Sequence, residues 1–118
     1  MIFIVDDDAG VRDSLRLLLE CEGLEARDFA SCREFLDAGV AGEGDCLILD
    51  VHMPGMSGIE LLETIRRRGD TLPIIVISGR IDITTRNRAR AAGTIGVVEK
   101  PYQVEEVLHL VRLAVNQG

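Results

Sequence analysis

Residues 46–58 read CLILDVHMPGMSG, and this stretch decides the fold. Its first four residues are apolar and its fifth is Asp50, so a short buried strand ends at a carboxylate. Three other short apolar runs also end at a polar residue: 2–5 before Asp6, 73–77 before Ser78, and 96–98 before Glu99. Segments with apolar residues at helical spacing lie between these runs. The alternation predicts an α/β fold whose parallel sheet is covered by helices on both faces.

The remaining elements complete five strand–helix units. The run 24–29 is interrupted by charged residues, which favours a half-exposed edge strand. Ser–x–x–Glu capping boxes begin helices at Ser31 and Ser57. We expect the other three helices around these residues: Val11 to Leu19 with a stop at Gly23, Asp82 to Ala92, and Val104 to Val115.

Composition sets further limits. The 118 residues correspond to one domain, and a net charge of −7 disfavours contact with nucleic acid or an anionic membrane. No apolar run is long enough to span a bilayer, and the N-terminus lacks the basic start of a signal peptide. The three cysteines are odd in number and scattered, which indicates reduced thiols in a cytoplasmic protein rather than disulfides or a zinc site.

The strand ends carry the chemistry. Ligands of open α/β sheets bind at the carboxyl ends of the strands, where this sequence places Asp6, Asp7 and Asp8 after the first strand and Asp50 after the third. Three adjacent carboxylates repel one another unless a cation lies among them, and a few hard oxygen ligands suit Mg²⁺. Lys100 and Ser78 could meet phosphoryl oxygens, so an aspartate could accept a phosphoryl group. Each residue alone has an ordinary structural explanation, as a turn, a cap or a loop, but their shared position at strand ends favours a site.

These residues resemble the receiver domain of two-component response regulators. The resemblance covers the whole chain and looks closest to the FixJ-type branch of LuxR-class transcriptional regulators. The runs that carry it are IVDDD at 4–8, LILDVHMPGMSG at 47–58, IVISG at 75–79 and EKP at 99–101. The resemblance implies a flavodoxin-like (CheY-like), doubly wound (βα)5 fold with strand order 2-1-3-4-5.

The resemblance also implies a role for each matching residue. Asp50 would accept a phosphoryl group from the phosphohistidine of a sensor histidine kinase. Mg²⁺, which Mn²⁺ could replace, would be bound by Asp7, Asp50 and the backbone carbonyl of His52, with Asp6 acting through a water. The phosphoryl group would meet Lys100, Ser78 and the open space beside Gly79. The peptide bond between Lys100 and Pro101 would be cis, which is inexpensive before proline.

Three positions leave the switch and its timing open. The family usually has an aromatic residue three positions before the lysine, but this chain has Val97, which has no ring to turn inward. Val97 is therefore either part of a switch carried mainly by the backbone after Ser78, or a packed strand residue. His52 and Arg80 either set the lifetime of the acyl phosphate or are simply exposed polar residues.

The predicted function is a phosphorylation-controlled switch that catalyses only its own phosphoryl transfer and autodephosphorylation. Residues 1–118 would form the receiver domain, with no output domain in this chain and a DNA-binding part missing from it. A phosphorylation-dependent homodimer is a further expectation. Two alternatives remain: a phosphatase of the haloacid dehalogenase type, for which the acceptor follows the wrong strand, and a receiver-like interaction module that is never phosphorylated.

Overall fold

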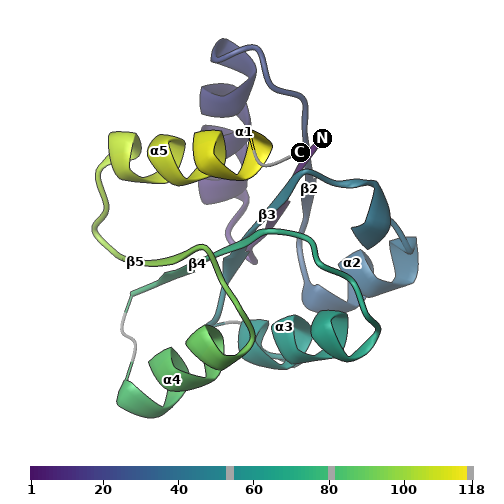
Figure 1. The fold of residues 1–118 in the computed structure, drawn as a ribbon. Coiled ribbons are helices and arrows are strands. Elements are labelled where there is room, and N and C mark those ends of the chain that lie inside the picture. The colour runs from purple at the N-terminus through teal and green to yellow at the C-terminus, as the bar shows by residue number, and fades with distance from the viewer. Residues whose placement is uncertain (53–54, 80–81, 117–118) are drawn as a thin grey trace.

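The computed structural model describes residues 1–52, 55–79 and 82–116. These residues form one parallel sheet of five strands in the order β2-β1-β3-β4-β5 (Figure 1). The strands are β1 (Ile2–Val5), β2 (Ala26–Phe29), β3 (Cys46–Asp50), β4 (Ile74–Ser78) and β5 (Gly96–Glu99). The order confirms the prediction, and it reverses direction between β1 and β3, where open sheets of this kind bind ligands.

Helices cover both faces of the sheet (Figure 1). One face carries α1 (Ala9–Cys21) and α5 (Val104–Val115). The other carries α2 (Cys32–Ala38), α3 (Gly58–Arg67) and α4 (Ile83–Ala91), and a short 3₁₀ turn spans Ala41–Glu43. Among the described residues, no helix has the length and apolar character needed to cross a bilayer.

The two faces follow from the alternation of side chains along each strand. Phe3 and Val5 point into the core beneath α2, α3 and α4, whereas Ile2 and Ile4 point into the core beneath α1 and α5. All four residues of β1 are buried, as the continuous apolar run predicts for a parallel strand with both faces covered.

Helix caps fix where the helices begin. Ser31, Ser57 and Asp82 each accept a hydrogen bond from a backbone N–H of the helix that follows, so the predicted starts of α2, α3 and α4 are confirmed. The first helix begins at Ala9, two residues before the predicted Val11, because the Asp8 carboxylate caps it. The edge strand is shorter than predicted and begins at Ala26 instead of Leu24.

Candidate functional site

Three carboxylates meet at the carboxyl ends of β1 and β3. Asp6 and Asp7 directly follow β1, and Asp50 is the last residue of β3. One oxygen from each lies within 4.8 Å of the others. Asp6 and Asp50 are only 4% and 5% exposed, whereas Asp7 is open to solvent. The structure therefore brings together three of the four acidic residues that the strand-end pattern placed at this edge, and these are the three that the resemblance named.

The turn after β1 holds Asp6 in place. Its carboxylate accepts the backbone N–H of Asp8 at 2.9 Å. Asp8 in turn accepts the backbone N–H of Gly10 at 2.8 Å and caps α1. Burial of Asp6 raises the pKa of its carboxyl group, and the negative charges of Asp50 and Asp7 raise it further. The hydrogen bond from Asp8 and the charge on Lys100 lower this pKa, but by less. The site therefore holds negative charge that the fold does not fully compensate.

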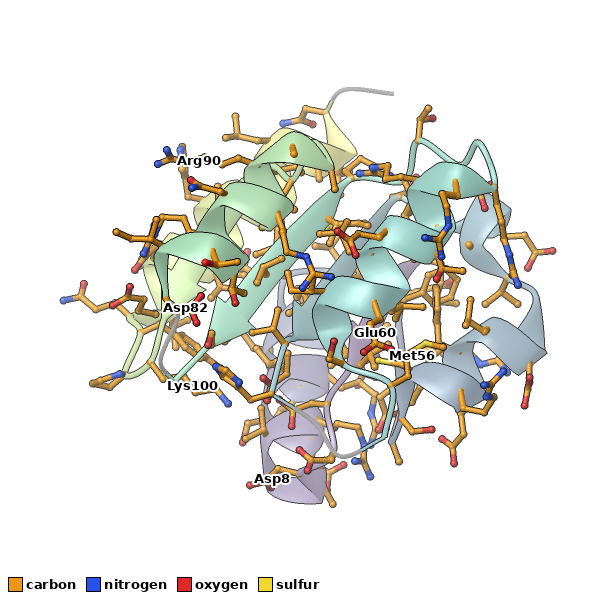
Figure 2. The ribbon with its side chains drawn as sticks, turned by 90° about the horizontal axis from the view of Figure 1, so that it is seen from below. Asp8, Met56, Glu60, Asp82, Arg90 and Lys100 are labelled. Carbon is orange, nitrogen blue, oxygen red and sulfur yellow. The ribbon has the colours of Figure 1, made fainter. Side chains whose placement is uncertain are left out.

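Asp50 has a different partner for each carboxylate oxygen. Oδ1 accepts the backbone N–H of His52 at 2.9 Å, and Oδ2 accepts the Lys100 ammonium at 3.3 Å. Partial burial opposes the charge on Lys100, but the charge and hydrogen bond of Asp50 outweigh it and raise the pKa of Lys100. Figure 2 labels Lys100, which follows β5, and Asp8, which precedes α1.

Gly58 lets α3 begin directly beneath this aspartate. A Cβ atom at position 58 would collide with the backbone carbonyl of Asp50 and would lie 2.6 Å from the Cα of Val51. The Gly58 N–H instead approaches closely enough to donate to the Val51 carbonyl at 3.3 Å. Steric crowding therefore explains why a glycine stands at position 58, at the end of the 46–58 motif.

The other predicted residues lie along the ends of β4 and β5. Ser78 ends β4, is fully buried, and its carbonyl accepts the Lys100 N–H at 2.8 Å. A Cβ atom at Gly79 would meet nothing within 4 Å, so the space beside Ser78 is open. The peptide bond between Lys100 and Pro101 is cis. Arg80 lies outside the described residues.

Two further predicted residues, Val97 and His52, have different surroundings. Val97 pairs with Val76 in the sheet and packs, half-buried, against the core beneath α2, α3 and α4. The charge on His52 helps to lower the pKa of Asp82, after the larger effect of hydrogen bonds from Thr85. His52 therefore lies near the residue that caps α4.

The donor set fits a hard divalent cation. Carboxylate oxygens are the ligands that Mg²⁺ prefers, and an octahedral ion held by two or three of them keeps several waters. The Lys100 ammonium donates to Oδ2 of Asp50, whereas the His52 N–H donates to Oδ1. Lys100 therefore balances part of the negative charge of the three carboxylates. The exposed Asp7 leaves the cluster accessible.

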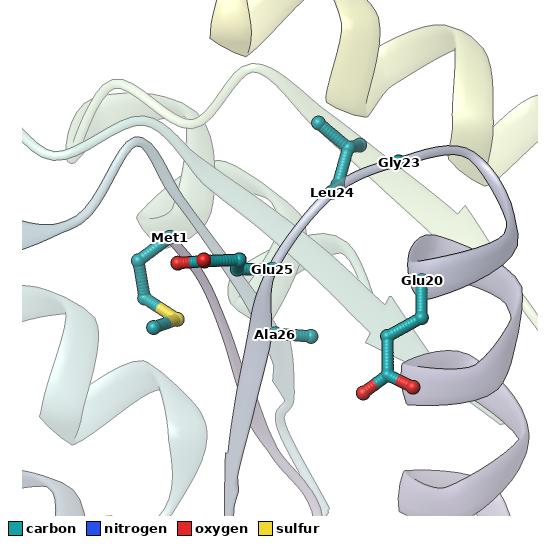
Figure 3. Close-up of a pocket in the computed structure, with 6 residues that line it drawn as sticks. All are labelled: Met1, Glu20, Gly23, Leu24, Glu25 and Ala26. Atoms are coloured by element: carbon teal, nitrogen blue, oxygen red, sulfur yellow. The ribbon is translucent and has the colours of Figure 1, made fainter.

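A surface hollow at the other edge of the sheet has none of this chemistry. It lies at the N-terminal ends of β1 and β2 (Figure 3) and is lined by Met1, Glu20, Gly23, Leu24, Glu25 and Ala26. The Glu20 carboxylate is paired with Arg16 at 3.8 Å, and the six lining residues include no lysine, arginine or hydroxyl-bearing side chain. This hollow therefore offers no side chain suited to a phosphoryl group.

The sequence interpretation missed two kinds of contributor. It gave Asp8 no role, although an aspartate just before a helical pattern is a standard N-cap signal. It also gave no role to Arg12 and Asp28, which pair across 16 positions of sequence at 2.9 Å. A charged residue that interrupts an apolar strand was the available signal for Asp28.

Comparison with known proteins assigns the family. Residues 2–112 match the model of the response regulator receiver domain. The chain is 37% identical over 117 residues to the transcriptional regulatory protein FixJ of Azorhizobium caulinodans, covering 99% of this chain and 56% of FixJ. It is 41% identical to the response regulator protein TmoT of Ectopseudomonas mendocina, covering 98% of this chain and 53% of TmoT. The chain thus spans about half the length of these curated relatives.

Solved structures agree. The response regulator StyR superposes with a TM-score of 0.91 at 38% identity, covering 98% of this chain and 59% of that one. The structure of FixJ-N superposes with a TM-score of 0.86 at 31% identity, covering 99% and 94%. The chain belongs to the response regulator receiver domain family, the phospho-accepting signalling switches of bacterial two-component systems. Domains of this family bind Mg²⁺ at an acidic pocket and receive their signal from a sensor kinase.

Proposed function

We propose that Asp50 is the phosphoacceptor of this domain. The observation that carries the proposal is the environment of its carboxylate, which is nearly buried, paired with Lys100, and within 4.8 Å of two further carboxylates. Such an aspartate can bind a phosphoryl group, because a lysine and a cation beside it would balance the charge of the phosphoryl oxygens.

The reaction is an in-line transfer. A carboxylate oxygen of Asp50 attacks phosphorus, and the bond from phosphorus to the histidine nitrogen of the kinase breaks as the new acyl phosphate bond forms. The Lys100 ammonium, which pairs with Asp50 in this structure, would then also pair with a phosphoryl oxygen. Ser78 donates its hydroxyl to another oxygen, in the space that Gly79 leaves open.

Mg²⁺ binding completes the proposed site. The ligands would be Asp7, Asp50 and the backbone carbonyl of His52, with Asp6 acting through a water, and Mn²⁺ could substitute. The cation supplies positive charge that offsets repulsion between the carboxylates and stabilises the charge that spreads over the phosphoryl oxygens during transfer. The support is the spacing of the three carboxylates and the raised pKa of Asp6.

The switch is proposed to run through the backbone after Ser78. Movement of its hydroxyl toward the phosphoryl group would draw the following loop and α4 with it. Val97 packs in the sheet, and it either couples this movement to the surface of β5 or serves only as a packed residue. A Val97→Phe variant whose phosphorylation-linked dimerisation equals that of the parent would count against a coupling role.

The lifetime of the acyl phosphate is proposed to depend on His52 and Arg80. Autodephosphorylation requires water to attack phosphorus, which releases inorganic phosphate and restores the Asp50 carboxylate. Both residues flank the phosphorylation site in sequence, two positions after Asp50 and Ser78 respectively. Parental rates of phosphate release from both His52→Ala and Arg80→Ala would contradict this role.

The wider setting follows from the family and the charge. We propose that this protein acts in the cytoplasm with a sensor histidine kinase as its partner. We also propose a phosphorylation-dependent homodimer, and control of transcription through a DNA-binding part outside residues 1–118. The receiver domain itself, with a net charge of −7, would contact neither nucleic acid nor membrane. The alternative is a receiver-like interaction module that is never phosphorylated.

Intact mass decides between these two functions. The chain is incubated with acetyl phosphate in Mg²⁺ or in EDTA, beside Asp50→Asn and the control Asp37→Asn, an exposed aspartate on α2. We expect the parent and Asp37→Asn to gain one phosphoryl mass in Mg²⁺ alone, and Asp50→Asn to gain none. A parent that gains no mass, even with a cognate kinase domain and ATP, would leave the interaction module.

A further inference from the structure

Arg12 joins three elements near the acidic cluster. It lies in α1, and its side chain is only 16% exposed. Its Nε donates to Oδ2 of Asp28 in β2 at 2.9 Å. Its Nη1 donates to the backbone carbonyl of Asp6, at the end of β1, at 2.8 Å. One guanidinium therefore ties the edge strand and the first helix to the turn that bears Asp6 and Asp7.

Asp28 is a firm anchor for this arginine. Its other oxygen accepts Nη1 of Arg16 at 2.7 Å, so the carboxylate is held between two guanidinium groups. Partial burial opposes ionisation of Asp28, but the hydrogen bonds and charges of Arg12 and Arg16 outweigh it and lower its pKa. Asp28 pairs with Ile4 in the sheet, which places the anchor alongside the last residues of β1.

With Arg12 in place, Asp6 is fixed at three points. Its backbone N–H donates to the Phe29 carbonyl at 3.2 Å, its carbonyl accepts Arg12, and its carboxylate accepts the Asp8 N–H. Three carboxylates that repel one another need such external constraint to stay within one cation's reach, because their own interaction drives them apart. Partners outside the first set of ligands commonly set the orientation of metal ligands in this way.

We infer that Arg12, anchored by Asp28, is a positioning residue for the cation site: it holds the turn of Asp6 and Asp7 in its binding geometry before the ion arrives. The inference rests on the proposed function only in assigning Mg²⁺ to the cluster. Arg12 touches neither the ion nor the phosphoryl group in this arrangement, and it acts through the backbone of Asp6.

The sign of the effect separates positioning from charge. Replacing either Arg12 or Arg16 removes one positive charge from the same region, and charge alone would tighten Mg²⁺ binding in both variants. Loss of positioning weakens binding, and only in the Arg12 variant. Arg16→Ala is a matched control, because Arg16 shares the helix and the Asp28 partner, and it forms ion pairs with Asp13, Glu20 and Asp28.

The test is the dissociation constant of Mg²⁺, measured by titration calorimetry on the whole chain, with thermal unfolding in EDTA as a check of the fold. We expect Arg12→Ala to weaken Mg²⁺ binding about 10-fold, and Arg16→Ala to leave it equal or tighter. Arg12→Lys keeps the charge and one donor for the Asp6 carbonyl, so it should recover part of the lost affinity. The backbone N–H signal of Asp8, which reports on the Asp6 carboxylate, should shift in the NMR spectrum of Arg12→Ala in EDTA and not in that of Arg16→Ala.

Each outcome has a definite meaning. Parental Mg²⁺ affinity in a folded Arg12→Ala variant, or an equal loss in Arg16→Ala, would overturn the positioning role while leaving the cation site intact. If Arg12→Ala does not fold, Arg12→Lys takes its place. Mg²⁺ binding by folded Arg12→Lys that is weaker than that of the parent supports the role, and parental affinity in both Arg12→Lys and Asp28→Ala overturns it. A parent that binds no Mg²⁺ would overturn the cation site and this inference with it.

Discussion

Replacing Asp6 by asparagine should stabilise the fold in the absence of divalent cations. The substitution keeps the shape of the side chain and an oxygen for the Asp8 N–H, but removes one of three clustered negative charges. At 4.8 Å and an effective dielectric constant of about 20, one pair of like charges repels by roughly 3.5 kcal/mol. Lys100 offsets part of this repulsion, so we expect a net gain of about 1–3 kcal/mol.

The assay is thermal unfolding in EDTA and in Mg²⁺. A gain of that size raises the melting temperature of a domain this long by roughly 4–12 °C. In Mg²⁺ the difference should shrink or reverse, because only the parent keeps the full ligand set and ligand binding stabilises the folded state. The control Asp37→Asn makes the same charge change on the exposed surface of α2 and should change the melting temperature little.

The pH dependence has a definite sign. The pKa of Asp6 is raised in the folded state, so the folded chain binds this proton more tightly than the unfolded chain does. The Asp6 carboxylate therefore lowers stability above its folded pKa, and the penalty disappears as pH falls toward the ordinary aspartate value of about 3.9. The advantage of Asp6→Asn should accordingly shrink on acidification. A variant that melts below the parent in EDTA at neutral pH, or a control that gains as much, would refute this reasoning.

Three further predictions concern the frame of the site. Gly58→Ala would force a Cβ atom into the backbone at the end of β3, so urea unfolding should show a loss of about 1–3 kcal/mol. Glu63→Gln removes a two-point ion pair with Arg88 of α4, at 2.6 and 3.1 Å, and should lower stability by no more than about 1 kcal/mol while hydrogen exchange of α4 amides rises. Burial raises the pKa of the Cys32 and Cys46 thiols to about 12, whereas Cys21 is exposed. At mild alkaline pH a thiol reagent should therefore label only Cys21 in the folded chain, and all three cysteines in denaturant.

Sequence reasoning predicted the parts of this domain that depend on local pattern. The runs before Asp6, Asp50 and Ser78 are apolar on both faces, and that property alone indicates buried parallel strands whose ends share one edge. The convergence of Asp6, Asp7, Asp50 and Lys100 follows from this rule. The strand order was available only through the family motifs, because spacing does not distinguish one arrangement of parallel strands from another.

The parts that escaped prediction depend on which side chains face each other across the fold. Arg12 could have paired with any of the neighbouring acids, including Asp8 and Asp13, and only the placement of β2 against α1 selects Asp28. The start of β2 moved for a similar reason: pairing with β1 begins at Ile2 opposite Ala26, so Leu24 precedes the ladder. Such choices are made by tertiary packing and leave no local signal.

The way α4 is attached explains how a small event at Asp50 could reach the surface. Of the nine residues of α4 only Ala89 is buried, whereas α3 buries five of its ten. Ion pairs supply much of the attachment instead: Arg86 meets Glu99 at 2.6 Å and Arg88 meets Glu63. Exposed ion pairs stabilise only weakly, so α4 is held less firmly than α3. Because α4 begins just after the Ser78–Gly79 loop and is capped by Asp82, which lies near His52, it is the element that the proposed phosphorylation of Asp50 would move most easily.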